Sequence, residues 1–117
     1  MDNEQMYEIA FQIIVHAGES RTLSASAVDK AEEYDFESAN NLLEKANEEF
    51  LQCHKIQTNL LTSEANGEKI QLNIIFIHAQ DHLTMASISM ANAKRFIKTY
   101  KKLKELEDKY EKCNSSL

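Results

Sequence analysis

Apolar and small residues recur at intervals of three and four positions along three successive segments of the chain. This spacing places them on one face of an α-helix, which has about 3.6 residues per turn. The first segment predicts a helix of about 30 residues. Its repeating positions are Met6, Ile9, Ile13, Ala17, Leu23 to Ala27, Val28 and Ala31.

A second helix follows the polar break at residues 33–38. Asp35 can cap the free amides at the start of this helix, and Glu37 favours its positive end. The apolar positions are Ala39, Leu42, Leu43, Ala46, Phe50, Cys53, Ile56 and Leu60. Asn66 and Gly67 end the helix, because glycine readily adopts the left-handed conformation that follows many helices.

A third helix is predicted from about Gln71 to Glu111, since no helix breaker interrupts its pattern. One face carries Leu72, Ile75, Ala79, Leu83, Ala86, Met90, Ala93, Ile97, Tyr100, Leu103 and Leu106. Three antiparallel helices joined by two short turns follow from these patterns. The expected fold class is therefore all-α, an antiparallel three-helix bundle that forms a single domain over residues 1–117.

The third helix also carries a second apolar stripe, formed by Ile74, Ile77, Asp81, Met85 and Ile88. Ile74, Asp81 and Ile88 are seven residues apart, as in the seam of a coiled coil. One three-helix bundle cannot bury both faces of its third helix. We therefore expect the chain to associate with copies of itself along this stripe.

Composition supports long helices, because the 117 residues include no proline and only two glycines. Two cysteines and the lack of a signal-peptide pattern favour a cytoplasmic protein with reduced thiols. Residues 70–93 match the length of a membrane span but contain too many polar residues, which argues against membrane insertion.

The formal net charge of −6 is distributed unevenly. Residues 1–69 carry five basic and fourteen acidic side chains, whereas residues 94–117 carry eight basic and four acidic ones. Basic and acidic side chains of this last segment are mixed on a helical repeat, which favours a solvated helix over a nucleic-acid surface.

The sequence HAQDH, residues 78–82, interrupts an otherwise apolar stretch with His78, Asp81 and His82 on one side of the helix, whereas Gln80 points elsewhere. The histidines could simply be structural. Asp81 weakens this interpretation, because self-association along the seam would bring its copies together and require protons or a cation to neutralise them.

Three chemical interpretations remain for the histidines and cysteines. His78 and His82 have the spacing of a zinc pair, but a third ligand and the glutamate of HExxH are missing. Cys53 and His54 are adjacent on a helix, so their side chains point in different directions. This disfavours a catalytic pair in which His54 is the base for a Cys53 nucleophile.

In the last interpretation, His78 accepts a phosphoryl group. Its neutral imidazole is abundant near neutral pH, and the phosphorylated nitrogen remains a good donor. No Lys or Arg lies between Lys69 and Lys94, so we expect another subunit or a partner to stabilise the phosphate.

Three segments carry a resemblance to a known family: IIVHAGESR, DFESANNLLEKANEEFLQCHKIQTNLL and EANGEKIQLNIIFIHAQDHLTMA. Over about residues 5 to 100, the chain resembles enzyme IIA of the lactose/cellobiose (N,N'-diacetylchitobiose) class of the bacterial phosphoenolpyruvate-dependent sugar phosphotransferase system. Two departures are the order Thr84-Met85, which is reversed in many relatives, and the tail from about Lys101, which is interpreted as a helix extension.

The resemblance implies a homotrimer of three-helix subunits. His78 would receive phosphate on its tele nitrogen from the histidine-containing phosphocarrier protein (HPr) and pass it to a cysteine of the cognate enzyme IIB. The membrane subunit IIC would then import a β-linked disaccharide such as cellobiose, lactose or chitobiose. Asp81 would bind a divalent cation, Mg²⁺, at the trimer axis.

Gln80 and His82 also match the motif, and we expect them to orient His78 or to contact phosphate at a subunit boundary. His16 is part of the family pattern too, but it is more consistent with a structural helix contact. A non-enzymatic helical adaptor that binds a basic partner is the main alternative function, and a zinc-dependent hydrolase is a distant third.

Overall fold

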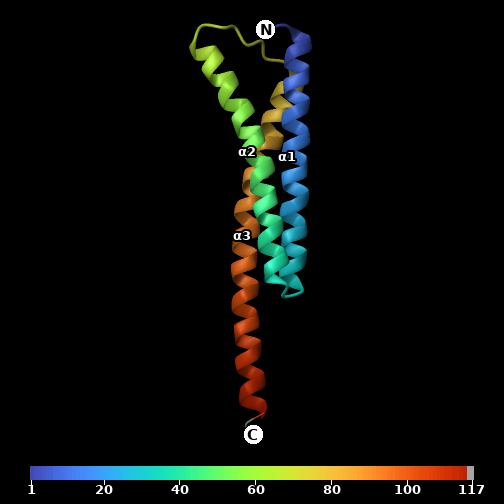
Figure 1. Cartoon of the computed structure of the whole chain (residues 1–117), viewed down its shortest axis with the longest axis vertical. Helices are drawn as coiled ribbons and strands as arrows, with labels where there is room; N and C mark the ends of the chain where they lie inside the picture. The colour runs from blue at the N-terminus through green and yellow to red at the C-terminus, as the bar shows by residue number, and fades with distance from the viewer. Residues whose placement is uncertain (116–117) are drawn as a thin grey trace.

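Three long α-helices form the computed structural model, which describes residues 1–115 (Figure 1). They are α1 (Asn3–Glu32), α2 (Phe36–Ala65) and α3 (Ile74–Ser115). α1 and α3 run in the same direction and α2 runs antiparallel to both, so the predicted all-α antiparallel three-helix bundle is confirmed. No helix within residues 1–115 has a stretch both long and apolar enough to cross a lipid bilayer.

Polar side chains define where the first two helices begin. Asp2 accepts a hydrogen bond from the backbone amide of Gln5, and the Gln5 side chain accepts one from the amide of Asp2, which forms a capping box. Asp35 caps α2 as predicted, since its carboxylate accepts from the Ser38 amide at 3.1 Å. This hydrogen bond lowers the pKa of Asp35.

The start of the third helix differs from the sequence-based prediction, because α3 begins at Ile74 rather than near Gln71. The Asn73 side chain accepts a hydrogen bond from the Phe76 amide at 2.9 Å and so acts as the cap. Leu72 therefore lies in the connecting loop and is exposed instead of packing on the helix face. At the other end, α3 continues past Glu111 to Ser115, and residues 116–117 of the predicted extension lie outside the described part.

The core has two clusters along the bundle. The cluster beside the α2–α3 loop contains Met6, Ile13, Cys53, Leu60, Phe76 and Leu83, and the one near the α1–α2 turn contains Ala27, Ala31, Ala39 and Ile97. Small buried side chains alternate with these on α1 and α3, which allows close packing of the two backbones. Each fully buried large apolar side chain contributes about 1.5–3 kcal/mol to stability.

Candidate functional site

His78 and His82 lie one turn apart on α3 and face each other. Their Nε2 atoms are 3.0 Å apart, and their rings meet edge to face with centroids 4.5 Å apart. A hydrogen bond at this distance needs a proton on one Nε2 and a free lone pair on the other. The structure thus joins the two imidazoles that the sequence analysis placed on one helix side.

The two rings differ in their surroundings. His82 is half-buried, and its Nδ1 is buried without a hydrogen-bond partner among the described residues. Burial lowers the pKa of His82, and the nearby His78 and Arg21 lower it further, while Asp81 opposes them. His82 therefore favours its neutral form.

His78 is the accessible member of the pair. Its side chain lines a shallow surface depression together with Tyr7, Asn73, Ile74 and Ile75, on the side where α3 lies beside α1. An exposed imidazole at the edge of a depression can be reached by a group on another protein.

Arg21 brings a cation of this chain near His82, which sequence reasoning did not foresee. Although no Lys or Arg occurs between Lys69 and Lys94, Arg21 of α1 lines a depression together with Thr22, His82 and Ser89. Its charge is close enough to lower the pKa of His82. No local feature of the sequence signals this proximity, because it depends on how α1 packs against α3.

Gln80 lies on a different side of α3 from the histidine pair. Its side-chain oxygen accepts a hydrogen bond from the side-chain amide (Nε2) of Gln57 on α2. The Nε2 of Gln80 itself is buried without a partner in the described structure. The structure therefore brings His78 and His82 together and directs Gln80 toward α2.

Asp81 is exposed in the single chain, in the middle of the second apolar stripe. The apolar members of this stripe are also exposed: Ile74 (87%), Ile77 (53%), Ile88 (56%) and Met85. No group of three or more His, Cys, Asp or Glu side chains within residues 1–115 is arranged to hold a metal ion. A metal site at Asp81 would thus need carboxylates from several copies.

A further exposed apolar stripe lies on α1, and the sequence analysis missed it. Tyr7, Phe11 and Val15 are four residues apart and exposed, and Tyr7 lines the same depression as His78. Their spacing was the available signal, but they lie outside the stripe of α1 that packs the core.

The remaining histidine and cysteine candidates have structural contacts. His16 Nδ1 lies 2.6 Å from a carboxylate oxygen of Glu49 on α2, in agreement with the expected helix contact. Cys53 is buried, and burial raises its pKa to about 11, so its thiolate is scarce near neutral pH. His54 packs beside the Phe50 ring. These features agree with the low weight given to a Cys53 and His54 pair.

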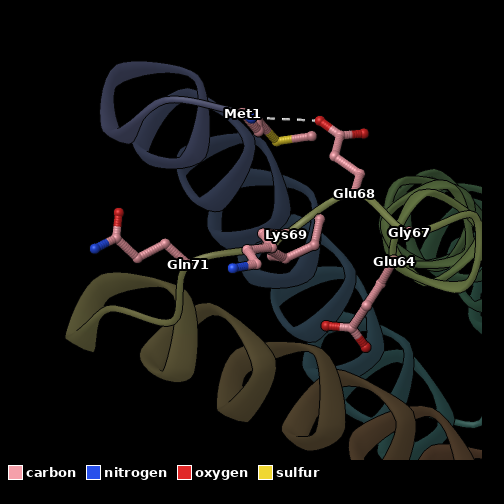
Figure 2. A pocket seen from close by; sticks show the side chains of 7 residues that line it. Met1, Glu64, Gly67, Glu68, Lys69 and Gln71 are labelled. Carbon is pink, nitrogen blue, oxygen red and sulfur yellow. Dashed lines mark ion pairs between the residues drawn. The ribbon is translucent and has the colours of Figure 1, made fainter.

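A large hollow lies at the α2–α3 loop, and Met1, Glu64, Gly67, Glu68, Lys69 and Gln71 are among the residues that line it (Figure 2). The Met1 amino group and the Glu68 carboxylate form an ion pair at 3.4 Å. No histidine or cysteine lines this hollow. The hollow therefore offers no imidazole or thiol nucleophile, and the histidine pair of α3 remains the candidate site.

Comparison with known families identifies the kind of protein that carries this histidine pair. Residues 8–101 match the family described as phosphotransferase system (PTS), lactose/cellobiose specific IIA subunit. The chain belongs to this family. The resemblance drawn from residues 5 to 100 is confirmed, and the adaptor and hydrolase alternatives are wrong.

Relatives of this IIA subunit cover nearly its whole length. The lichenan-specific phosphotransferase enzyme IIA component of Bacillus subtilis is 40% identical over 103 residues, which are 88% of this chain and 94% of the relative. The crystal structure of the cellobiose-specific enzyme IIA of Bacillus anthracis has a TM-score of 0.84 and 36% identity, covering 90% of this chain and 94% of that one.

A more distant structure shows the same fold. It is the chitobiose IIA protein of Escherichia coli, solved in a complex with HPr, with a TM-score of 0.73, 24% identity and coverage of 85% of this chain and 96% of that one. Family membership makes this protein a phosphotransferase component that carries phosphate between proteins during sugar transport.

Proposed function

We propose that this IIA subunit carries phosphate on Nε2 of His78, receiving it from HPr and delivering it to a cysteine of the cognate enzyme IIB in the cytoplasm. The observation that supports this most strongly is the geometry of the histidine pair, in which an exposed His78 meets His82 through Nε2 at 3.0 Å. The membrane subunit IIC would use the phosphate during uptake of a β-linked disaccharide such as cellobiose, lactose or chitobiose.

The reaction consists of two phosphoryl transfers. In the first, the Nε2 lone pair of His78 forms a bond to phosphorus while the bond to the donor histidine of HPr breaks. In the second, the IIB thiolate forms a sulfur–phosphorus bond and the Nε2–phosphorus bond breaks. Positioning and electrostatic stabilisation supply most of the catalysis in such transfers.

The position of the shared proton assigns a role to His82. For Nε2 of His78 to be the nucleophile, the proton of the pair must reside on Nε2 of His82. His82 Nδ1 is then an unprotonated atom, which suits its buried position without a partner better than an orphaned N–H would. His82 donates to His78 before the transfer, and after a ring movement the same N–H can donate to a phosphoryl oxygen.

Arg21 supplies positive charge beside His82. A guanidinium group binds phosphoryl oxygens well and stays charged throughout the transfer. Gln80 contributes indirectly, because its hydrogen bond to Gln57 anchors the turn of α3 that carries His78.

A homotrimer built around α3 accounts for the exposed seam. Burial of Ile74, Ile77 and Ile88 between copies would bring three Asp81 carboxylates together. Carboxylate oxygens are suitable ligands for Mg²⁺, which usually also keeps several waters, so the chemistry of the donor set fits a divalent cation at the axis. The cation would neutralise the like charges, and Asp81 would have a structural role.

Incubation with phosphoenolpyruvate, enzyme I and HPr tests the assignment. The wild-type chain should gain the mass of one phosphoryl group through an acid-labile, alkali-stable bond, and it should lose this mass when the cognate IIB is added. His78→Ala should abolish the gain, whereas His54→Ala, a matched change on α2, should preserve it. Full phosphorylation of His78→Ala would exclude His78 as the acceptor.

A further inference from the structure

Basic and acidic side chains that are mixed along residues 94–115 are separated around the circumference of α3. At about 100 degrees per residue, seven cations lie within a sector of about 120 degrees, here named the basic stripe. All are exposed: Lys94, Arg95, Lys98, Lys101, Lys102, Lys109 and Lys112. Glu105 is the one acidic residue of this segment in the same sector. The stripe is about 27 Å long, since an α-helix rises about 1.5 Å per residue.

The remaining charges of the segment lie on another side of α3. Glu107, Asp108 and Glu111 occupy it together with Lys104, whose Nζ forms an ion pair with Asp108 at 2.9 Å. Lys104 is thus neutralised within the chain. Seven basic residues against one acidic residue give the sector of the basic stripe a formal net charge of +6.

Most cations of the basic stripe have no anionic partner in the chain. Five of them form no ion pair within residues 1–115: Lys94, Arg95, Lys98, Lys102 and Lys109. Lys101 instead lies over the Phe36 ring, with its Nζ 5.8 Å from the centroid. Like charges three and four positions apart destabilise a helix, so an anionic surface would relieve repulsion along the stripe.

The basic stripe lies beside the apolar seam that contains Asp81. The centre of the stripe is about 100 degrees away from Asp81 around the helix. Its C-terminal end belongs to the part of α3 that projects beyond α1 and α2 (Figure 1). The seam and the stripe are therefore different surfaces of α3, and this end of the stripe stands clear of the acidic first two helices.

The composition of the basic stripe favours lipid headgroups over a nucleic acid or a folded acidic protein. Six of its seven cations are lysines. An ammonium group is a flexible point charge, whereas the planar fork of arginine suits phosphates and carboxylates held at fixed positions. Headgroups of a fluid bilayer can move to meet such charges, and each Lys or Arg near an anionic bilayer adds to the attraction.

We propose that the basic stripe docks this IIA subunit on the surface of an anionic lipid bilayer. The contact is electrostatic and peripheral, with α3 lying along the headgroups and no segment inserted. The charge argument does not depend on the phosphoryl-transfer assignment of His78. Where that assignment also holds, docking concentrates the phosphate carrier close to its membrane subunit.

Co-sedimentation of the full chain with lipid vesicles tests the proposal. Vesicles of phosphatidylcholine and phosphatidylglycerol in equal amounts should bind the chain at least about 10-fold more tightly than vesicles of phosphatidylcholine alone. Added sodium chloride should weaken this binding, because it screens exposed charges. Equal binding to both kinds of vesicle would overturn the proposal. A chain that binds double-stranded DNA but not the anionic vesicles would also overturn it and assign the stripe to nucleic acid.

Removal of charge from the stripe is compared with the same removal elsewhere. The stripe variant combines Lys98→Gln, Lys102→Gln and Lys109→Gln. The control variant combines exposed positions of α2 and the α2–α3 loop: Lys45→Gln, Lys55→Gln and Lys69→Gln. Both remove three positive charges and so lower the formal net charge from −6 to −9. Glutamine is a good helix former, and circular dichroism checks that both variants keep their helices.

The two triple variants should differ clearly in vesicle binding. The stripe variant should bind the anionic vesicles about 10- to 100-fold more weakly than wild type, because each lysine at such a surface contributes a factor of about five. The control variant should stay within about three-fold of wild type, since its lysines do not face the bilayer. Equal losses in both variants would overturn the proposal, because binding would then follow net charge alone.

The single carboxylate of the stripe allows a test by gain of binding. Glu105→Gln should tighten binding to the anionic vesicles about two- to five-fold. Glu111→Gln changes the net charge equally on the other side of α3 and should have little effect. Equal tightening by both variants would contradict docking through the basic stripe.

Vesicle binding and phosphorylation are measured separately. His78→Ala should bind the anionic vesicles as wild type does. A stripe that fails to bind vesicles would overturn docking and leave the role of His78 intact, whereas a failure of phosphorylation alone would bear on His78 only.

Discussion

Nε2 of His82 lies 3.0 Å from Nε2 of His78, so the half-buried ring holds the exposed ring by the very nitrogen that would attack phosphorus. In the proposed transfer, His82 would therefore position His78 and would also donate to the phosphoryl group. Its hydrogen bond also occupies the lone pair of His78, which must be released before transfer.

Replacing His82 should slow phosphoryl transfer without unfolding the bundle. We expect His82→Ala to lower the rate of transfer from HPr about 10- to 100-fold, the range expected for loss of one hydrogen bond to a charged group. His82→Gln keeps an N–H donor and should recover part of the rate. Stopped-flow transfer measurements at saturating HPr, with circular dichroism as the folding control, would check both. Equal rates for wild type and His82→Ala would remove His82 from the mechanism.

The neighbouring charge of Arg21 should be visible in the titration of His82. Burial, His78 and Arg21 lower the pKa of His82 below 6.5, so the unfolded chain binds more protons than the folded one as the pH falls below this value. Stability should therefore fall as the pH drops from 6.5 toward the folded pKa, and this effect should be absent above 6.5. Arg21→Gln should raise the pKa of His82 and slow the transfer, whereas Arg21→Lys should preserve the lowered pKa. A titration by nuclear magnetic resonance in which Arg21→Gln leaves the pKa unchanged would contradict the proposed proximity.

The fold could be predicted from the sequence because the features that mark each helix are local. Helical periodicity, the Asp35 cap and Gly67, whose φ is +93°, mark two helices and their ends correctly. The start of α3 was placed too early, since the apolar pattern continues through Leu72 and the capping role of Asn73 appears only in its hydrogen bond to Phe76.

Only part of the candidate site could be predicted from the sequence. The pairing of His78 with His82 follows from their spacing on one helix, but contacts between helices do not follow from such spacing. Arg21 beside His82, Glu49 beside His16 and Gln57 beside Gln80 all join residues at least 23 positions apart in the sequence. Their proximity depends on how the three helices are rotated and shifted against one another.

Gln57 and Gln80 should behave as a matched pair. If Gln80 acts by anchoring α3 to α2, Gln57→Ala and Gln80→Ala should each cost about 1 kcal/mol of stability and slow the transfer to a similar, small extent. Thermal unfolding and transfer assays of the two single variants and the double variant would measure this coupling. If Gln80→Ala stopped phosphorylation while Gln57→Ala did not, Gln80 would have to contact the phosphoryl group itself.

Removal of the Asp81 charge should free the assembly from its need for a cation. Wild-type trimer is expected to dissociate when a chelator removes divalent cations, because three carboxylates would then repel across the axis. Asp81→Leu removes the repulsion together with the metal ligand, so its trimer should persist with chelator and be at least as stable. Sedimentation with and without EDTA measures both. Thr84→Leu changes an exposed position three residues after Asp81 on α3 and controls for the added apolar surface. A monomeric Asp81→Leu chain would contradict the axial cation.

Direct observation of the phosphorylated atom tests the central claim. Nitrogen-15 spectra of histidine-labelled protein, recorded after incubation with phosphoenolpyruvate, enzyme I and HPr, report which ring nitrogen is bonded to phosphorus. We predict coupling to phosphorus at Nε2 of His78 alone, with His82 observed as the Nε2–H tautomer before transfer. Phosphorus bonded to Nδ1 of His78, or to any nitrogen of His82, would contradict the account.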